Sequence, residues 1–252
     1  MPTPDFSEQG KSKGLKPRDF KSHPLGSLTF APRPVMQTIP RSEWKDIIEA
    51  KTAEKSWIWD RCKDRVPILD QDGYSWCWNH SLAGAAMCAR EGANLDFVLL
   101  SPASLGYVVS WNKDSGAYIL DAMEAIQKNG ICSSPPFPML TNDGRYWTSE
   151  AQRIAANHRF KCYDLDSNNW DELVTMALDN KVHDNGINDW GHSTYGGVEM
   201  RWNAQKNRPE MRQVNSWAKT WGEDGTYWVW EGSQHYPNEA YALLVADSVP
   251  LV

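Results

Sequence analysis

Apolar residues recur at helical spacing through the first half of the chain. Within residues 79–90, Leu82, Ala83, Ala86 and Met87 fall on one face of a helix. Capping signals and apolar periodicity predict further helices over residues 42–50, from 101 onward, over 116–128 and over 169–178. A short apolar run at residues 66–69 is typical of a strand.

After about residue 186 the pattern changes to short β-branched and aromatic runs separated by turn residues. These runs predict strands over residues 193–202, 212–217, 225–230 and 241–245. Helices followed by strands indicate an α+β protein whose two sub-domains meet at a cleft. The sequence contains no internal repeat.

Residues 1–40 differ from the rest of the chain. They hold seven of the fifteen prolines, and six Lys or Arg residues against three acidic ones, without apolar periodicity. Such a segment is expected to be an extended basic arm rather than part of a core. Residues 41–252 are predicted to form the folded domain. The arm is expected to dock on that domain or on an assembly partner.

Composition narrows the class of protein. With 252 residues, 41% of them hydrophobic, the chain is large enough to bury a core of its own. No apolar run reaches the roughly 18 residues of a spanning helix, and the first thirty residues hold no secretory signal. We therefore expect neither a membrane protein nor a secreted one. The net charge of −6 disfavours nucleic acid as a partner.

One of the five cysteines stands apart from the others. An odd number leaves at least one thiol unpaired, and a reducing compartment would keep all five reduced. Cys77 lies where a loop containing Gly73 and Ser75 ends and an apolar helix begins. The helix dipole is expected to lower the pKa of this thiol and favour the nucleophilic thiolate. The alternative is a small buried hydrophobic residue.

The second half of the chain supplies partners for a nucleophilic thiol. His192, at a turn that enters a strand, is a candidate base, and Asn215 is a candidate acceptor that would orient its ring. His183 is a rival base, although residues 181–185 are expected to form a polar loop. Gln71 would direct an amide N–H toward an oxyanion beside the Cys77 backbone N–H. Cys77 and His80 lack a second pair of ligands, so no metal site is expected.

These segments resemble the papain-like cysteine proteases. The resemblance covers roughly residues 57–247 and rests on residues 71–78, Leu100-Ser101-Pro102, Ser115-Gly116, His192 and Asn215-Ser216-Trp217 with the glycines that follow. It implies a papain-like fold, with a helical and an antiparallel β sub-domain on either side of the active-site cleft. It also implies that Cys77 is the nucleophile, His192 the general base and acid, Asn215 the orienting residue and Gln71 the oxyanion donor.

The same resemblance suggests which residues line the substrate cleft. Gly116 matches the family's glycine that binds substrate backbone, and Ser115, Trp76, Trp217 and Trp190 are expected beside it. The departures are Tyr74 at the place of a family cysteine, Trp76 in the usual Gly-Ser pair, Ser115 for the first glycine and Ala218 after Trp217. His192 lies 115 residues after Cys77, earlier than the roughly 130–150 of the family.

Two functions follow as hypotheses. The first is a cysteine endopeptidase that hydrolyses peptide bonds through a thioester and needs no cofactor, its arm filling the cleft as a plug or anchoring the protein. The alternative is a papain-fold structural or binding protein, such as a component of a phage particle, with weak or no protease activity. Trp76 and Ser115 favour the alternative. The expected location is the cytoplasm or a phage particle.

Overall fold

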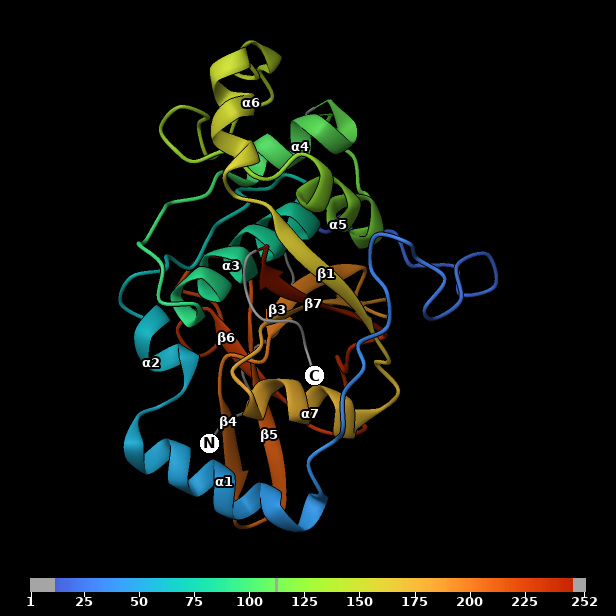
Figure 1. The fold of residues 1–252 in the computed structure, drawn as a ribbon, viewed down its shortest axis with the longest axis vertical. Coiled ribbons are helices and arrows are strands. Elements are labelled where there is room, and N and C mark those ends of the chain that lie inside the picture. Colours follow the sequence, from blue (N-terminus) through green and yellow to red (C-terminus); the bar gives the residue numbers. More distant parts are fainter. Residues whose placement is uncertain (1–11, 112, 247–252) are drawn as a thin grey trace.

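A buried helix, α3 (Cys77–Gly92), forms the centre of the helical half of the protein. The computed structural model describes residues 12–111 and 113–246. The side chains of α3 from Cys77 to Cys88 are all buried, because other helices and the sheet cover it on every side. Three helices pack against it: α2 (Ile58–Cys62), α4 (Pro102–Ser110) and α5 (Ile119–Lys128). The helix α6 (Ser149–Ala156), which follows the short helix η1 (Gly144–Tyr146), lies farther out, at the end of this half (Figure 1).

The other half is built on one seven-stranded sheet. The strands run in the order β1-β7-β2-β3-β5-β4, β6 pairs with β5, and every pairing is antiparallel. Two helices, α1 (Arg41–Glu54) and α7 (Trp170–Leu178), pack with the sheet in this half (Figure 1). The strands are β1 (Phe160–Leu165), β2 (His183–Ile187), β3 (His192–Gly196), β4 (Met200–Asn203), β5 (Arg208–Val214), β6 (Thr226–Val229) and β7 (Glu239–Val245).

Two hydrophobic cores correspond to the two halves. The first gathers apolar side chains of α3, α4 and α5, including Leu82, Leu105 and Ile126. The second lies between the sheet and helices α1 and α7, around Trp44 and Leu173. The expected α+β class with a helical and an antiparallel β sub-domain is therefore confirmed. Among the residues that the structure describes, no helix is long and apolar enough to cross a bilayer.

The helix predictions agree with the structure, whereas three β-structure expectations were wrong. Residues 66–69 form no strand, and only a bridge between Asp70 and Trp217 follows them. The single strand expected over 193–202 is two, β3 and β4, because the chain turns at Gly197, where φ is +76°. The polar stretch around His183 is not a loop but the fully buried strand β2.

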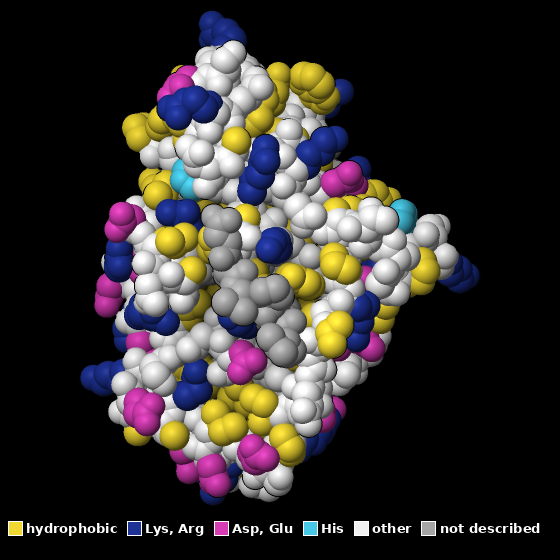
Figure 2. Space-filling view, in the orientation of Figure 1, with side chains coloured by type: hydrophobic (Ala, Val, Ile, Leu, Met, Phe, Trp, Pro, Cys, Tyr) yellow, Lys and Arg dark blue, Asp and Glu magenta, His cyan; other side chains and the backbone are white. Residues whose placement is uncertain are grey.

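The described part of the predicted arm, residues 12–40, contains no helix or strand and packs on the protein's own body. The Pro32 carbonyl accepts a hydrogen bond from Asp164 N of the edge strand β1 at 3.0 Å, and Ile39 N donates to Thr175 Oγ1 of α7 at 2.9 Å. In Figure 1 this segment descends past α7 to α1. On the face drawn in Figure 2, acidic and basic side chains are interspersed. Residues 1–11 of the arm lie outside the described residues.

Candidate active site

Cys77 is the first residue of α3, with Trp76 as the N-cap. The first N–H groups of a helix have no partner within the helix, so they are free to bind groups placed at its end. The Cys77 thiol is fully buried and accepts hydrogen bonds from the backbone N–H groups of Ser193, Gly14 and Trp78. Since Ser193 directly follows His192, the start of β3 lies against the start of α3.

His192 is held by Asn215 in one orientation. Asn215 Oδ1 lies 2.6 Å from His192 Nε2 and also accepts the Ser216 backbone N–H at 2.7 Å. Because that oxygen is an acceptor, Nε2 of the ring carries the proton that it receives. Nδ1 of His192 has no hydrogen-bond partner among the described residues. The free lone pair of the imidazole is therefore on Nδ1.

Two tryptophans enclose the His192–Asn215 pair. The ring centroid of Trp217 lies 4.3 Å from that of His192, and Trp190 meets the histidine edge-on at 4.9 Å. Both indoles are at most 2% exposed. The two indoles keep water away from the hydrogen bond between His192 and Asn215. Such a bond is stronger in surroundings of low dielectric constant.

Gln71 is buried beside the same group of residues. Its Oε1 accepts the Ser216 hydroxyl at 2.7 Å, which fixes the amide so that Nε2 points the other way. Nε2 donates to two carbonyl oxygens, those of Ser12 at 2.9 Å and Tyr74 at 2.6 Å. The side-chain amide of Gln71 thus already donates to carbonyl oxygens. An oxyanion donor would bind the same kind of atom in a substrate.

Residues 12–16 of the arm occupy the site; we call them the plug. The plug runs parallel to the segment after Gly116: Ala117 N donates to the Gly14 carbonyl and Lys16 N to the Ala117 carbonyl, both at 2.9 Å. On the sheet side, Leu15 N donates to the Gly191 carbonyl at 3.1 Å. Trp217 Nε1 donates to the Ser12 carbonyl at 3.3 Å. The plug is therefore bonded to both halves of the protein.

Two glycines allow this close approach. A Cβ atom at Gly14 would overlap the carbonyl oxygen of Ser75, and one at Gly116 would overlap the carbonyl oxygen of Gly14. Neither overlap is with the end of a flexible side chain, so backbone would have to move. Gly14 is the residue type that lets the chain pass between Cys77, Ser75 and Gly116.

Burial dominates the electrostatics of the candidate pair while the plug is in place. Burial raises the pKa of the Cys77 thiol to about 12, although the backbone N–H groups of Ser193 and Gly14 oppose the shift. Burial likewise lowers the pKa of His192 to about 3, although the hydrogen bond that His192 donates to Asn215 opposes the shift. The expectation that the helix terminus favours thiolate is wrong for this state, because the loss of water outweighs the helix dipole. Here the pair is a neutral thiol and a neutral imidazole.

The structure brings Gln71, Cys77, His192, Asn215, Trp190 and Trp217 together, with Gly116 against the plug. Ser115 is exposed on the loop before Gly116. Trp76 is fully buried: its indole stacks on Tyr74 at 4.4 Å and donates to the Lys113 carbonyl at 3.3 Å, so its bulk packs against that loop.

His183, the rival base, belongs to a different buried network. Its Nδ1 contacts Asn185 Oδ1 at 2.8 Å, within β2, and Asn185 in turn binds Gln213. All five cysteines are buried free thiols. Within residues 12–111 and 113–246, no three His, Cys, Asp or Glu side chains gather to hold a metal ion.

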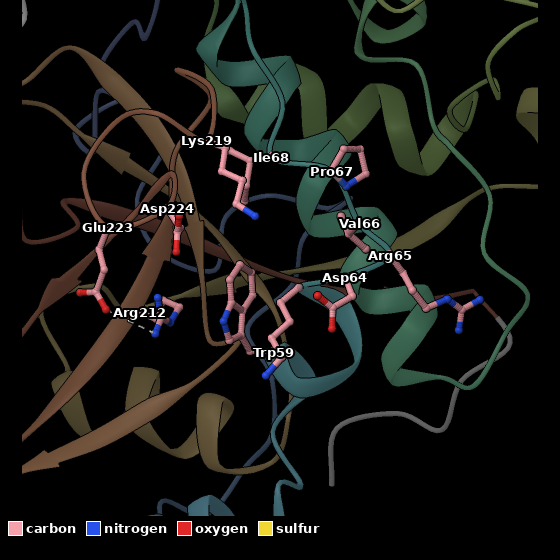
Figure 3. A pocket seen from close by; sticks show the side chains of 11 residues that line it. Trp59, Asp64, Arg65, Val66, Pro67, Ile68, Arg212, Lys219, Glu223 and Asp224 are labelled. Atoms are coloured by element: carbon pink, nitrogen blue, oxygen red, sulfur yellow. Dashed lines mark ion pairs between the residues drawn. The ribbon is translucent and has the colours of Figure 1, made fainter.

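A surface cavity of about 620 Å³ lies apart from this site (Figure 3). None of the predicted site residues lines it. Both of its arginines form ion pairs: Arg212 binds Glu199 at 2.6 Å and approaches Glu223 at 4.0 Å, and Arg65 binds Glu91. Sequence reasoning missed Gly14, whose signal was weak: a single glycine beside Leu15 in a polar, proline-rich arm.

The comparisons with known proteins show which fold these elements form. No protein-family model matches the sequence, and no curated protein matches it. The structure is similar to xylellain, a cysteine protease from Xylella fastidiosa, with a TM-score of 0.63, 16% identity, and 93% of this chain and 96% of that chain covered.

Two further solved structures are similar. Procathepsin B from Trypanosoma congolense has a TM-score of 0.65 and 17% identity, over 95% of this chain and 88% of that chain. The bromelain protease from Ananas comosus, in complex with the inhibitor E64, has a TM-score of 0.60 and 13% identity, over 73% and 96%. At such identities the likeness shows the fold, and the chain has the divergent papain-like fold that its motifs predicted.

Proposed function

We propose that this papain-fold chain is a cysteine endopeptidase whose own arm blocks the active site in the state described. The observation that carries the proposal is the grouping around one buried thiol: Cys77 at a helix terminus, the His192–Asn215 pair beside it, and the Gln71 amide bound to a peptide carbonyl. Xylellain, a solved structure of similar fold, is a cysteine protease, and another is a procathepsin.

The residues have complementary chemical roles. Once the plug leaves, Nδ1 of His192 takes the proton of Cys77, and the thiolate attacks the carbonyl carbon of a peptide bond. The carbonyl oxygen becomes an oxyanion that accepts N–H groups from Gln71 and from the Cys77 backbone. The C–N bond breaks, His192 returns the proton to the leaving amine, and a thioester remains. Water, deprotonated by His192, hydrolyses the thioester and frees the carboxyl product and Cys77.

The plug itself is not presented as a substrate. The Gly14 N–H donates to the Cys77 sulfur, so this edge of the Lys13–Gly14 peptide, rather than the face of its carbonyl carbon, is directed at the nucleophile. In a trans peptide the N–H and C=O point in opposite directions, so the Lys13 carbonyl oxygen is turned away from the thiol. The plug thus occupies the site without offering a bond for attack.

Removal of the plug would also restore the reactive charge state. The shifts in the Cys77 and His192 pKa values both come mainly from burial. When water returns to the site, the cost of a charged thiolate and imidazolium falls, and each charge stabilises the other. Displacement of residues 12–16 is therefore the activating step.

The test compares peptide hydrolysis by three full-length chains that carry Gly14→Ala to displace the plug. The first has no other change, the second adds Cys77→Ala and the third adds Cys88→Ala, a matched control for another buried thiol of the same helix. Cleavage of an unfolded protein substrate, followed by mass spectrometry, should occur with the first and third and not with the second. A chain whose Cys77 is open to alkylation but that cleaves nothing would instead be a papain-fold binding module.

A further inference from the structure

Arg18, just after the plug, inserts its side chain into the body of the protein at a place distinct from the Cys77 site. Its side chain is 1% exposed, and both terminal nitrogens bind Asp164: Nη1 to Oδ1 at 2.6 Å and Nη2 to Oδ2 at 3.0 Å. This is the bidentate geometry that suits the planar guanidinium and not a lysine ammonium.

Every N–H group of this guanidinium has an acceptor. Beyond the two bonds to Asp164, Nη1 contacts the Tyr241 hydroxyl at 3.2 Å. Nε donates to the His23 carbonyl at 2.8 Å and Nη2 to the Pro24 carbonyl at 3.0 Å. Those five contacts match the five donors of arginine. The ring of Phe20 covers the guanidinium, 4.6 Å from Cζ.

The acidic residues near the Arg18 guanidinium belong to the sheet. Asp164 of the edge strand β1 stands opposite Tyr241 of β7 in the register, and the Tyr241 hydroxyl donates to Glu239 Oε2 at 3.1 Å. Asp164, Tyr241 and Glu239 are each at most 1% exposed. The buried Asp164 carboxylate, which binds the cation directly, makes the site selective for positive charge, since a buried carboxylate without its cation is costly. We call these three residues the arginine socket.

The arginine socket is tied to the plug by a short piece of chain. Arg18 follows Gly14 by four residues, a separation that an extended chain spans in at most about 14 Å. Pro17 within this piece has a restricted φ, which reduces its freedom to slacken. While Arg18 is held, residues 12–16 cannot move far from Cys77.

We propose that Asp164, Tyr241 and Glu239 form a recognition site for an arginine side chain, and that its occupation by Arg18 latches the plug over Cys77. The binding half of this proposal, that the arginine socket binds an arginine side chain, rests on the geometry of the socket alone. The latching half, that bound Arg18 holds the plug over Cys77, rests on the proposed blocking role of the plug. When Arg18 withdraws, the site accepts the guanidinium of an arginine-bearing peptide.

The binding half is tested on the full chain with Arg18→Ala, using ethylguanidinium as the probe. The substitution should lower the melting temperature, and millimolar ethylguanidinium should raise it again in a saturable manner. The same concentration of ethylammonium should not, and neither cation should stabilise the double variant Arg18→Ala with Asp164→Asn. Equal effects of the two cations, or equal effects on wild type, would overturn the site.

The latching half is tested by the rate at which iodoacetamide alkylates Cys77. Arg18→Ala should be alkylated at least tenfold faster than wild type, even with ethylguanidinium present, because the free cation is not attached to the plug. Arg33→Ala is the matched control, since it removes another ion pair of the arm, with Glu172 at 2.9 Å, and should leave the rate unchanged. A wild-type rate in Arg18→Ala would refute the latch.

A second variant covers the case in which Arg18→Ala does not fold. Arg18→Lys keeps the charge but cannot make the forked contact with Asp164, so it should fold and still be alkylated faster than wild type. Protection equal to wild type in Arg18→Lys would show that any cation suffices, against an arginine-specific socket. These readouts need no catalysis, so they stay distinct from a failure of the peptidase proposal, in which an alkylatable Cys77 cleaves nothing.

Discussion

Gly14→Ala should release the plug without touching any residue that is proposed to take part in the chemistry. The new Cβ would overlap the Ser75 carbonyl oxygen, so the plug backbone must move away from Cys77. That movement breaks the Gly14–Ala117, Lys16–Ala117 and Leu15–Gly191 hydrogen bonds. At about 1 kcal/mol net for each bond, the plug loses about 3 kcal/mol of its hold, which corresponds to about a hundredfold change in the closed-to-open ratio.

The assay is the second-order rate of Cys77 alkylation by iodoacetamide, followed by intact mass and peptide mapping. The Gly14→Ala chain should react about a hundredfold faster than wild type at the same pH, because the plug loses three hydrogen bonds that hold it closed. Arg33→Ala is the control, because it removes an ion pair of the arm with Glu172 and leaves residues 12–16 unchanged. If Gly14→Ala folds and Cys77 reacts at the wild-type rate, the plug does not control access and the reasoning from its contacts is wrong.

Two further predictions concern single carboxyl and amide groups. In the Gly14→Ala background, Gln71→Ala should lower kcat by about 10²–10³ through the loss of one oxyanion donor, while Cys77 alkylation is unchanged; an unaltered kcat would remove Gln71 from the mechanism. Burial raises the pKa of Glu239 to about 7, so this carboxyl group binds a proton more tightly in the folded protein than in the unfolded chain. Its contribution to stability is therefore fully present below about pH 4.5 and is lost as the pH rises to about 7. Urea unfolding at pH 5 and pH 8 should show a loss of up to about 3 kcal/mol in wild type that Glu239→Gln lacks; equal pH dependence in the two chains would contradict the shift.

The residues proposed to carry the chemistry were within reach of sequence reasoning because each belongs to a local motif. Cys77 opens an apolar helix, His192 follows a turn glycine, and Asn215 heads an Asn-Ser-Trp run. Their types and order along the chain made them candidates. The structure places His192 in contact with Asn215, and Ser193, next to His192 in the chain, against the Cys77 thiol. The shift in the Cys77 pKa was not accessible in this way, because it comes mainly from burial, and the backbone N–H groups nearest the thiol include those of Gly14 and Ser193, both far away in sequence.

The parts that escaped prediction are polar groups whose partners lie far away in sequence. Strand β2 looked like a loop because His183 and Asn185 are polar, yet both are buried within a hydrogen-bonded network that includes Gln213. The burial of Asp164 likewise depends on distant partners, since its carboxylate binds Arg18, 146 residues away, and the backbone N–H of Gly26. Local sequence patterns predict local structure. Whether a polar side chain can be buried depends on a hydrogen-bond partner, and that partner can lie outside the local pattern.

The most direct test of a plugged Cys77–His192 pair is the pH profile of Cys77 alkylation in wild type, Gly14→Ala, and Gly14→Ala with His192→Ala. Wild type should react slowly and speed up toward alkaline pH, since its thiol pKa is about 12. Gly14→Ala should react fast and almost independently of pH between about 6 and 8, as a thiolate paired with imidazolium does, and loss of His192 should abolish that plateau. A Gly14→Ala profile that rises like an ordinary thiol near pH 8.5, with or without His192, would contradict the account.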